Sequence, residues 1–197
     1  MFAVLIFFLS LYFTATTLDN KKQEILDASF TEATPFSYGA GHAQPNLAMD
    51  PGLVYDLTVN DYLNFLCALG YNKNVILLFS TNSTYTCPEN AISLVNFNYP
   101  SITVPKLSGS ITVTRRVKNV GSPGTYQARV KTPQGVSVTI APKSLKFINV
   151  GEEKSFKVII KAKNASVTKD YVFGELIWSD EKQHQHQVRS PIVIKAV

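Results

Sequence analysis

The chain has 197 residues, of which 45% are hydrophobic and only 17% are charged. This composition supports a buried core and excludes a disordered chain. The formal net charge is +5, but most basic residues are scattered lysines, and the only adjacent basic pairs are Lys21-Lys22 and Arg115-Arg116. Nucleic-acid binders concentrate such charge on one face. We therefore expect an ordinary basic surface and no nucleic-acid partner.

Residues 1–13, MFAVLIFFLSLYF, form an apolar N-terminal segment in which Ser10 is the only polar side chain. The run is too short for a membrane span, which needs about 20 apolar residues, so no span is expected. It has the length of a signal-peptide core. However, no Lys or Arg precedes it, and a helix or strand cut from a larger domain fits equally well. Both interpretations stay open.

Residues 35–56, PFSYGAGHAQPNLAMDPGLVYD, contain His42, one of three histidines. His42 could act as a base toward nearby Ser37, but neither residue lies in a nucleophile motif. Gly39 and Gly41 permit a tight backbone path, and the residues after His42 predict a short helix between prolines. We therefore assign no catalytic residue here and expect His42 to be structural.

Residues 58–69 predict a helix that is capped at both ends. Thr58 is the expected N-cap with Asp61 at the third helical position, and Gly70 supplies the stop. The apolar side chains at helical spacing are Tyr62, Phe65, Leu66 and Leu69. A short apolar run, residues 75–79, follows.

Two cysteines, Cys67 and Cys87, lie on this helix and at the end of the polar loop that follows it. A disulfide between them would close a loop of about 20 residues and stabilise the fold by roughly 3 kcal/mol. The alternative, a catalytic thiol paired with His42, is disfavoured by the apolar neighbours of Cys67. Glycosylation sequons at Asn82 and Asn164, together with the even cysteine count, indicate a secreted protein.

After residue 95 the chain alternates apolar and polar residues in seven or eight short runs, separated by turn segments such as NVGSPG, TPQG, APKS and NVGEE. This pattern predicts an antiparallel β-sandwich. Pro191, inside the last run, predicts an edge strand or a bulge. Trp178 and Phe173 are expected to be core aromatics.

His184 and His186 would share one face of a strand, as two metal ligands can. A zinc site needs three or four ligands, and no nearby Cys or acidic cluster completes the set. We expect an exposed polar strand end, with no metal and no cofactor.

Several long stretches resemble plant subtilisin-like serine proteases (subtilases). YGAGHAQPNLAMDPGLVYDLTVNDYLNFLCALGY is similar to the end of their protease domain, and TATTLDN to the segment just after their nucleophile helix. The stretches NYPSITVP, VTRRVKNVG, FGELIWSD and VRSPIVIKA resemble the fibronectin type III-like domain that follows. The resemblance implies a mainly β chain: an apolar segment (1–13), a helical and irregular remnant of the α/β protease domain (14–94) and a fibronectin III-like sandwich (95–197).

The resemblance does not bring the catalytic apparatus, because the family's Asp, His, Ser and oxyanion Asn lie upstream of the matching segment. We expect the C-terminal part of a secreted endopeptidase of the apoplast or cell wall, inactive alone, whose partner is the missing catalytic domain. The alternative is a stand-alone, non-catalytic secreted binding module. Without the protease domain, apolar residues such as Tyr62, Phe65 and Leu66 would be exposed, so residues 96–197 should fold better alone than the full chain.

Overall fold

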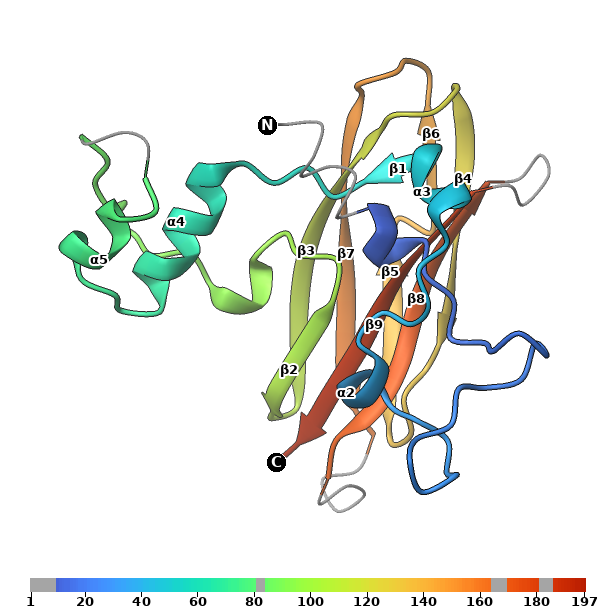
Figure 1. Ribbon diagram of the computed structural model, residues 1–197. Helices are drawn as coiled ribbons and strands as arrows, with labels where there is room; N and C mark the ends of the chain where they lie inside the picture. Colours follow the sequence, from blue (N-terminus) through green and yellow to red (C-terminus); the bar gives the residue numbers. More distant parts are fainter. Residues whose placement is uncertain (1–9, 81–83, 164–169, 181–185) are drawn as a thin grey trace.

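The computed structural model describes residues 10–80, 84–163, 170–180 and 186–197 (Figure 1). Two sheets pack face to face, a four-stranded sheet in the order β1-β3-β7-β5 and a five-stranded sheet in the order β2-β9-β8-β4-β6. The strands are β1 Leu53–Val54, β2 Ile102–Leu107, β3 Ser110–Asn119, β4 Gly124–Lys131, β5 Val136–Ala141, β6 Ser144–Phe147, β7 Glu153–Ala162, β8 Val172–Asp180 and β9 Gln187–Ala196.

The alternation in the sequence positions the core between the sheets. In β7 the side chains of Phe156, Val158 and Ile160 are buried, while Lys157 and Lys161 on the other face are exposed. Trp178 of β8 is fully buried and packs edge-on against Phe156, with 5.1 Å between ring centroids. The predicted turn segments connect the strands. The predicted fibronectin III-like sandwich, including a buried Trp178, is therefore confirmed.

Two features of the sandwich differ from expectation. β2 pairs with β9 in parallel, whereas the other strand pairs among the described residues are antiparallel. Pro191 does not lie on an edge strand, because β9 lies between β2 and β8, and its register with β8 is continuous. The β2 ladder begins only at Ile192. Pro191 thus has a strand on one side alone, which a residue without an N–H tolerates.

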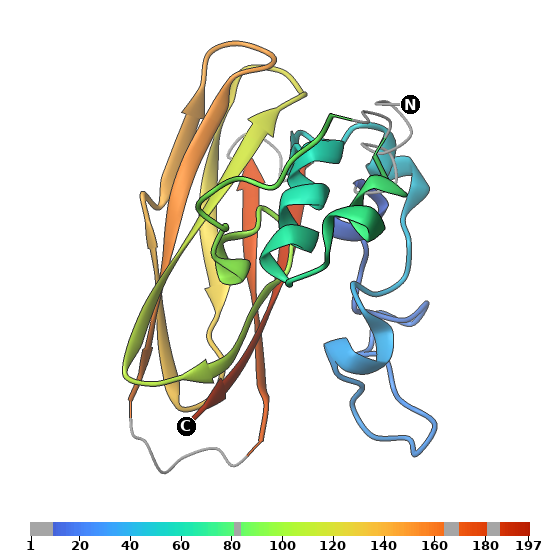
Figure 2. The same cartoon turned by 90° about the vertical axis from the view of Figure 1, so that its left-hand side faces the viewer.

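Residues 10–57 lie against the outer face of the five-stranded sheet (Figure 2). They include the helices α2 Pro35–Tyr38 and α3 Pro45–Met49, the second of which was predicted between its prolines. Their last part, β1, enters the sandwich and pairs with β3 through Leu53↔Asn119 and Val54↔Lys118. Because this segment covers β9 from outside, β9 is buried on both faces from Val188 to Ile194.

The helices α4 Val59–Ala68 and α5 Lys73–Leu77 project from the side of the sandwich (Figure 1). Thr58 and Asp61 form a capping box, as predicted. Gly70 ends α4: its N–H donates to the carbonyl of Cys67, and the N–H of Tyr71 donates to Leu66, the pair of bonds that defines a Schellman stop. Across the described residues we find no helix long and apolar enough to span a bilayer.

Candidate functional site

The turn that carries His42 is held by its backbone. The N–H of His42 donates to the carbonyl of Thr16, and the Thr16 N–H donates back, at 2.8 and 2.9 Å. Gly41 has a φ of +111°, and a Cβ there would collide with the Thr16 carbonyl. Ser37 lies exposed on α2. We find no hydrogen bond from the His42 ring to another described residue, and the turn has the geometry of a scaffold.

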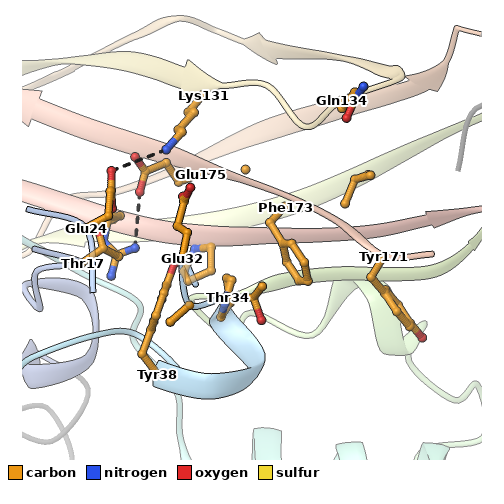
Figure 3. Close-up of a pocket in the computed structure, with 16 residues that line it drawn as sticks. Thr17, Glu24, Glu32, Thr34, Tyr38, Lys131, Gln134, Tyr171, Phe173 and Glu175 are labelled. Carbon is orange, nitrogen blue, oxygen red and sulfur yellow. Dashed lines mark hydrogen bonds and ion pairs between the residues drawn. The ribbon is translucent and has the colours of Figure 1, made fainter. Parts of the chain in front are cut away.

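A cavity of about 390 Å³ separates residues 17–38 from the outer face of β8 and β9 (Figure 3). One ion pair links the two walls, with Lys131 4.0 Å from Glu24, and a second pair, Arg189 and Glu175 at 3.3 Å, lies within the sheet. Arg189 also donates to the carbonyl of Ala40. The described residues that line this cavity include no Ser, Cys or His. A Ser–His or Cys–His pair is therefore not present among these lining residues.

Phe173 lines this cavity and is not a core aromatic, contrary to the expectation from sequence. Side chains alternate between the two faces of β8, and Leu176 and Trp178 point into the core. Phe173 lies on the opposite face and so points away from the core of the sandwich. There it meets the ring of Phe36 on α2, with 5.3 Å between centroids and nearly perpendicular planes. Phe173 can be apolar on an outer face of the sheet because α2, which is distant in sequence, covers it.

An apolar groove of about 620 Å³ lies between α4 and the start of the sandwich. Tyr62 and Phe65 form one wall, and Phe97, which contacts both rings at centroid distances of 5.6 and 4.6 Å, forms the floor. The remaining lining residues are Leu94, Val95, Tyr99, Ser101, Thr103, Pro105 and Arg115. Leu94 is 43% exposed, and Leu78 and Phe79 on the neighbouring α5 region are 81% and 64% exposed. Exposed apolar side chains beside an apolar groove are characteristic of a binding face.

Cys67 and Cys87 form a disulfide, as predicted, and neither cysteine is free. The bridge ties the end of α4 to the loop that returns toward the sandwich. Tyr85, two residues before Cys87, donates its hydroxyl proton to the side-chain oxygen of Asn64 on the same helix at 2.6 Å. The bridge is therefore structural and fixes one side of the apolar groove. The sequon residues Asn82 and Asn164 lie outside the described residues.

His186 is not part of an exposed strand end, contrary to the expectation from sequence. Its side chain is 14% exposed and lies between the carboxylates of Asp50 and Asp180, at 3.1 and 3.0 Å. Asp50 comes from the end of α3, which sequence spacing could not bring near β9. His184 lies outside the described residues. Within the described ranges there is no group of three or more His, Cys, Asp or Glu arranged to hold a metal ion.

Arg115 is an organising residue that sequence reasoning did not identify. Its side chain lies on the inward face of β3 and is buried. The guanidinium donates to the carbonyls of Val95, Tyr99 and Ser101 at 2.8–3.2 Å. Burial lowers the pKa of Arg115 to about 10. The alternation of β3 could have indicated that Arg115 is buried, because it lies two residues from each of the buried Val113 and Val117 and so on the same face of the strand.

Asn96 and Asn98 attach the same segment, which precedes β2, to β3. Their side-chain oxygens accept the N–H groups of Thr114 and Arg116 at 2.9 and 2.7 Å, and the Asn98 amide donates to the Arg116 carbonyl. The two side chains thus occupy part of the β3 edge that β1 leaves open. Together with Arg115, they fix the position of Phe97 beneath the groove.

The sandwich can be compared with known families at this point. Residues 96–194 match the fibronectin type-III domain. The chain belongs to that family.

The resemblance to plant subtilisin-like proteases is also confirmed. The chain is 58% identical to Subtilisin-like protease SBT5.3 and 53% identical to Subtilisin-like protease SBT5.4, both of Arabidopsis thaliana, over 92% of its length. It is 43% identical to the CO(2)-response secreted protease of the same plant. The chain spans only about a quarter of the length of these relatives, 23–24%.

Proposed function

We propose that this chain is the non-catalytic C-terminal part of a secreted subtilisin-like serine endopeptidase. In this role it stabilises the catalytic domain and helps frame substrate access. One observation carries the proposal. Over 92% of its length the chain is 58% identical to a subtilisin-like protease, and the matching segment makes up 23% of that protease. Similarity of that extent includes both the sandwich and residues 14–94.

The apolar groove between α4 and β2 is the proposed contact with the rest of the protease. Its lining is mainly aromatic and aliphatic and includes the exposed Leu94, and Leu78 and Phe79, which follow α5, are further exposed apolar side chains. Burying such a surface contributes about 25 cal/mol per Å² removed from water. About three quarters of each relative lies outside the matching segment, which is ample to supply a covering domain.

The cohesion of residues 10–57 with the sandwich supports a role as a rigid platform. The Tyr55 hydroxyl meets Ser190 in the core, and Lys118 meets Asp56 at 2.8 Å. The hydrogen bond and the charge of Asp56 raise the pKa of Lys118. A catalytic domain joined to this segment would thereby be connected firmly to both sheets.

The absence of a family triad predicts no hydrolysis by this chain alone. The purified chain is tested for release of labelled peptides from casein and for covalent labelling by a fluorophosphonate. We expect neither, because the sequence contains none of the family motifs that carry the catalytic Asp, His and Ser. Stoichiometric labelling of one serine, lost in the matching Ser→Ala variant, would contradict the assignment.

Secretion is part of the same proposal and is supported by the Cys67–Cys87 disulfide, since structural disulfides persist mainly in oxidising compartments. Expression in plant cells with a C-terminal tag on the complete gene product should place the protein in the extracellular fluid. Glycosidase treatment should reduce its apparent mass, and the double variant Asn82→Gln/Asn164→Gln should not respond. A tagged protein that stays in the cytosol with two free thiols would overturn this part.

The stand-alone binding module remains the competing hypothesis, since the same groove could hold another protein. Pull-down with the purified chain and the catalytic part of a relative separates the two. Capture of the catalytic part supports the protease assignment. Failure to capture it, with folded material on both sides, favours the module.

A further inference from the structure

His186 links three segments that are distant in the chain. Its Nε2 lies 3.1 Å from an Asp50 carboxylate oxygen, and its Nδ1 lies 3.0 Å from an Asp180 carboxylate oxygen. A neutral imidazole has one N–H and one lone pair, so it can donate to only one of these carboxylates. The imidazolium has two N–H groups and a positive charge, so it can hydrogen-bond Asp180 and also attract the Asp50 carboxylate at ion-pair distance. The geometry of the site therefore fits the protonated ring.

Asp50 belongs to a corner that delivers β1 to the sandwich. Pro51 and Gly52 follow it, and the Gly52 carbonyl accepts the N–H groups of Val120 and Gly121 at 2.9 and 3.1 Å. A Cβ on Gly52, which has a φ of +73°, would collide with the Tyr126 hydroxyl and the His186 ring. The corner is thus packed directly on His186, and its position determines how Leu53 and Val54 enter the core.

The groups that face His186 differ in their exposure. Asp180 on β8 is 16% exposed at its side chain, and its second carboxylate oxygen has no hydrogen-bond partner among the described residues. Asp50 is 72% exposed. Tyr126 on β4 approaches the same corner, and burial, with further contributions from Asp180 and Asp50, raises its pKa to about 12. Tyr126 therefore stays neutral while a histidine titrates. Glu181, Lys182 and His184 adjoin in sequence and lie outside the described residues.

We propose that His186 is a pH-sensitive latch between the residue 50–52 corner and the sandwich. In acid, the imidazolium hydrogen-bonds Asp180, forms an ion pair with Asp50 and so holds the corner. When the ring loses its proton, one nitrogen becomes an acceptor facing a carboxylate. The exposed Asp50 then turns to water, while the buried Asp180 keeps the remaining N–H. The latch is closed while both ring nitrogens carry protons and opens when one proton is lost at higher pH.

The test is hydrogen exchange of the Val120 and Gly121 amides, which bond the corner directly. After correction for the intrinsic effect of pH, their protection in the wild-type chain should fall about fivefold between pH 5 and pH 8, as expected for a partly exposed ion pair. His186→Gln and Asp50→Asn should each remove most of this pH dependence. His42→Gln and His184→Gln are matched controls and should retain it.

A second readout keeps the proposal separate from effects on folding. Long-range ¹H–¹⁵N NMR spectra distinguish an imidazolium from a neutral ring, and at pH 5 both nitrogens of His186 should carry protons. An unchanged pH dependence in His186→Gln, or a ring that is neutral at pH 5, would overturn the proposal. If His184→Gln alone abolishes the dependence, His184 is the titrating group and the latch is wrongly assigned.

Discussion

The Tyr55 hydroxyl and the Ser190 Oγ lie 2.7 Å apart in the interior of the protein, although 135 residues separate them in the chain. Tyr55 follows β1, and Ser190 lies in β9, so this bond joins the segment before α4 to the five-stranded sheet. Both residues are at most 1% exposed. Burial raises the pKa of Tyr55 to about 12, which keeps the phenol neutral.

Tyr55→Phe should lower the free energy of unfolding by about 1–3 kcal/mol, because the Ser190 hydroxyl is left buried without this partner. The double variant Tyr55→Phe/Ser190→Ala removes both polar groups and should recover part of the loss. Urea unfolding followed by the fluorescence of the single, buried Trp178 measures both. The single variant Ser190→Ala completes the cycle, and strict additivity of the two single effects in the double variant would argue against the bond.

Arg115 and Arg116 are adjacent arginines with different environments. Arg115→Met should destabilise the chain by about 2–4 kcal/mol, because the backbone carbonyls of Val95, Tyr99 and Ser101 lose their donor. Arg116→Met is the matched control. Its side chain is about half exposed and pairs with Glu153 at 3.2 Å, a surface contact of ~1 kcal/mol at most. Equal effects in denaturant unfolding would refute the assigned role of Arg115.

The boundary of the stable sandwich can be tested with fragments. The sequence led us to expect that residues 96–197 fold better alone than the full chain does. Because Leu53, Val54 and Tyr55 are buried in the core, we now predict that a fragment beginning at residue 52 is more stable than one beginning at residue 96. Each lost side chain corresponds to about 1.5–3 kcal/mol of burial. Urea midpoints of the two fragments and the full chain decide the order.

Glu152 should make a small pH-dependent contribution to stability. Its carboxylate pairs with Lys154 at 2.8 Å and accepts the Ile148 N–H at 2.7 Å. The Lys154 hydrogen bond, followed by the Ile148 bond, lowers the pKa of Glu152 below its usual 4.5. A lowered folded-state pKa stabilises the protein above the usual value, and this contribution is lost as the pH falls through the folded-state value. Glu152→Gln should therefore lower the melting temperature slightly at pH 7, and the difference should vanish near pH 2. A constant difference at both pH values would be inconsistent with this.

The elements that the sequence predicts well are those with local signals. The helix from Thr58 to Gly70 is bounded by a capping box and a glycine stop, which act within one turn. The strands follow from alternation, and the disulfide from the cysteines around one loop. The tight turn at His42 follows from the adjacent glycines.

The features that sequence reasoning missed depend on contacts between distant segments. Phe173 lies outside the core because α2 covers it, and Pro191 occupies an inner strand because the β2 ladder starts one residue later. His186 is nearly buried because Asp50 reaches it from α3. Arg115 is buried among carbonyls supplied 14–20 residues earlier. None of these contacts has a signal within a single element.

The most direct test of the central claim is the proteolytic activity of a chimera. In it, this chain replaces the matching quarter of Subtilisin-like protease SBT5.3, with which it shares 58% identity. We predict an active, secreted enzyme. Leu94→Lys in the groove should leave the melting of the isolated chain unchanged, because Leu94 is 43% exposed. In the chimera it should reduce activity about tenfold or more, because an interface would bury the unpaired charge. Ile148→Lys, at an exposed position outside the groove, should have no effect. An inactive parent chimera, or equal activity of the two lysine variants, would contradict the account.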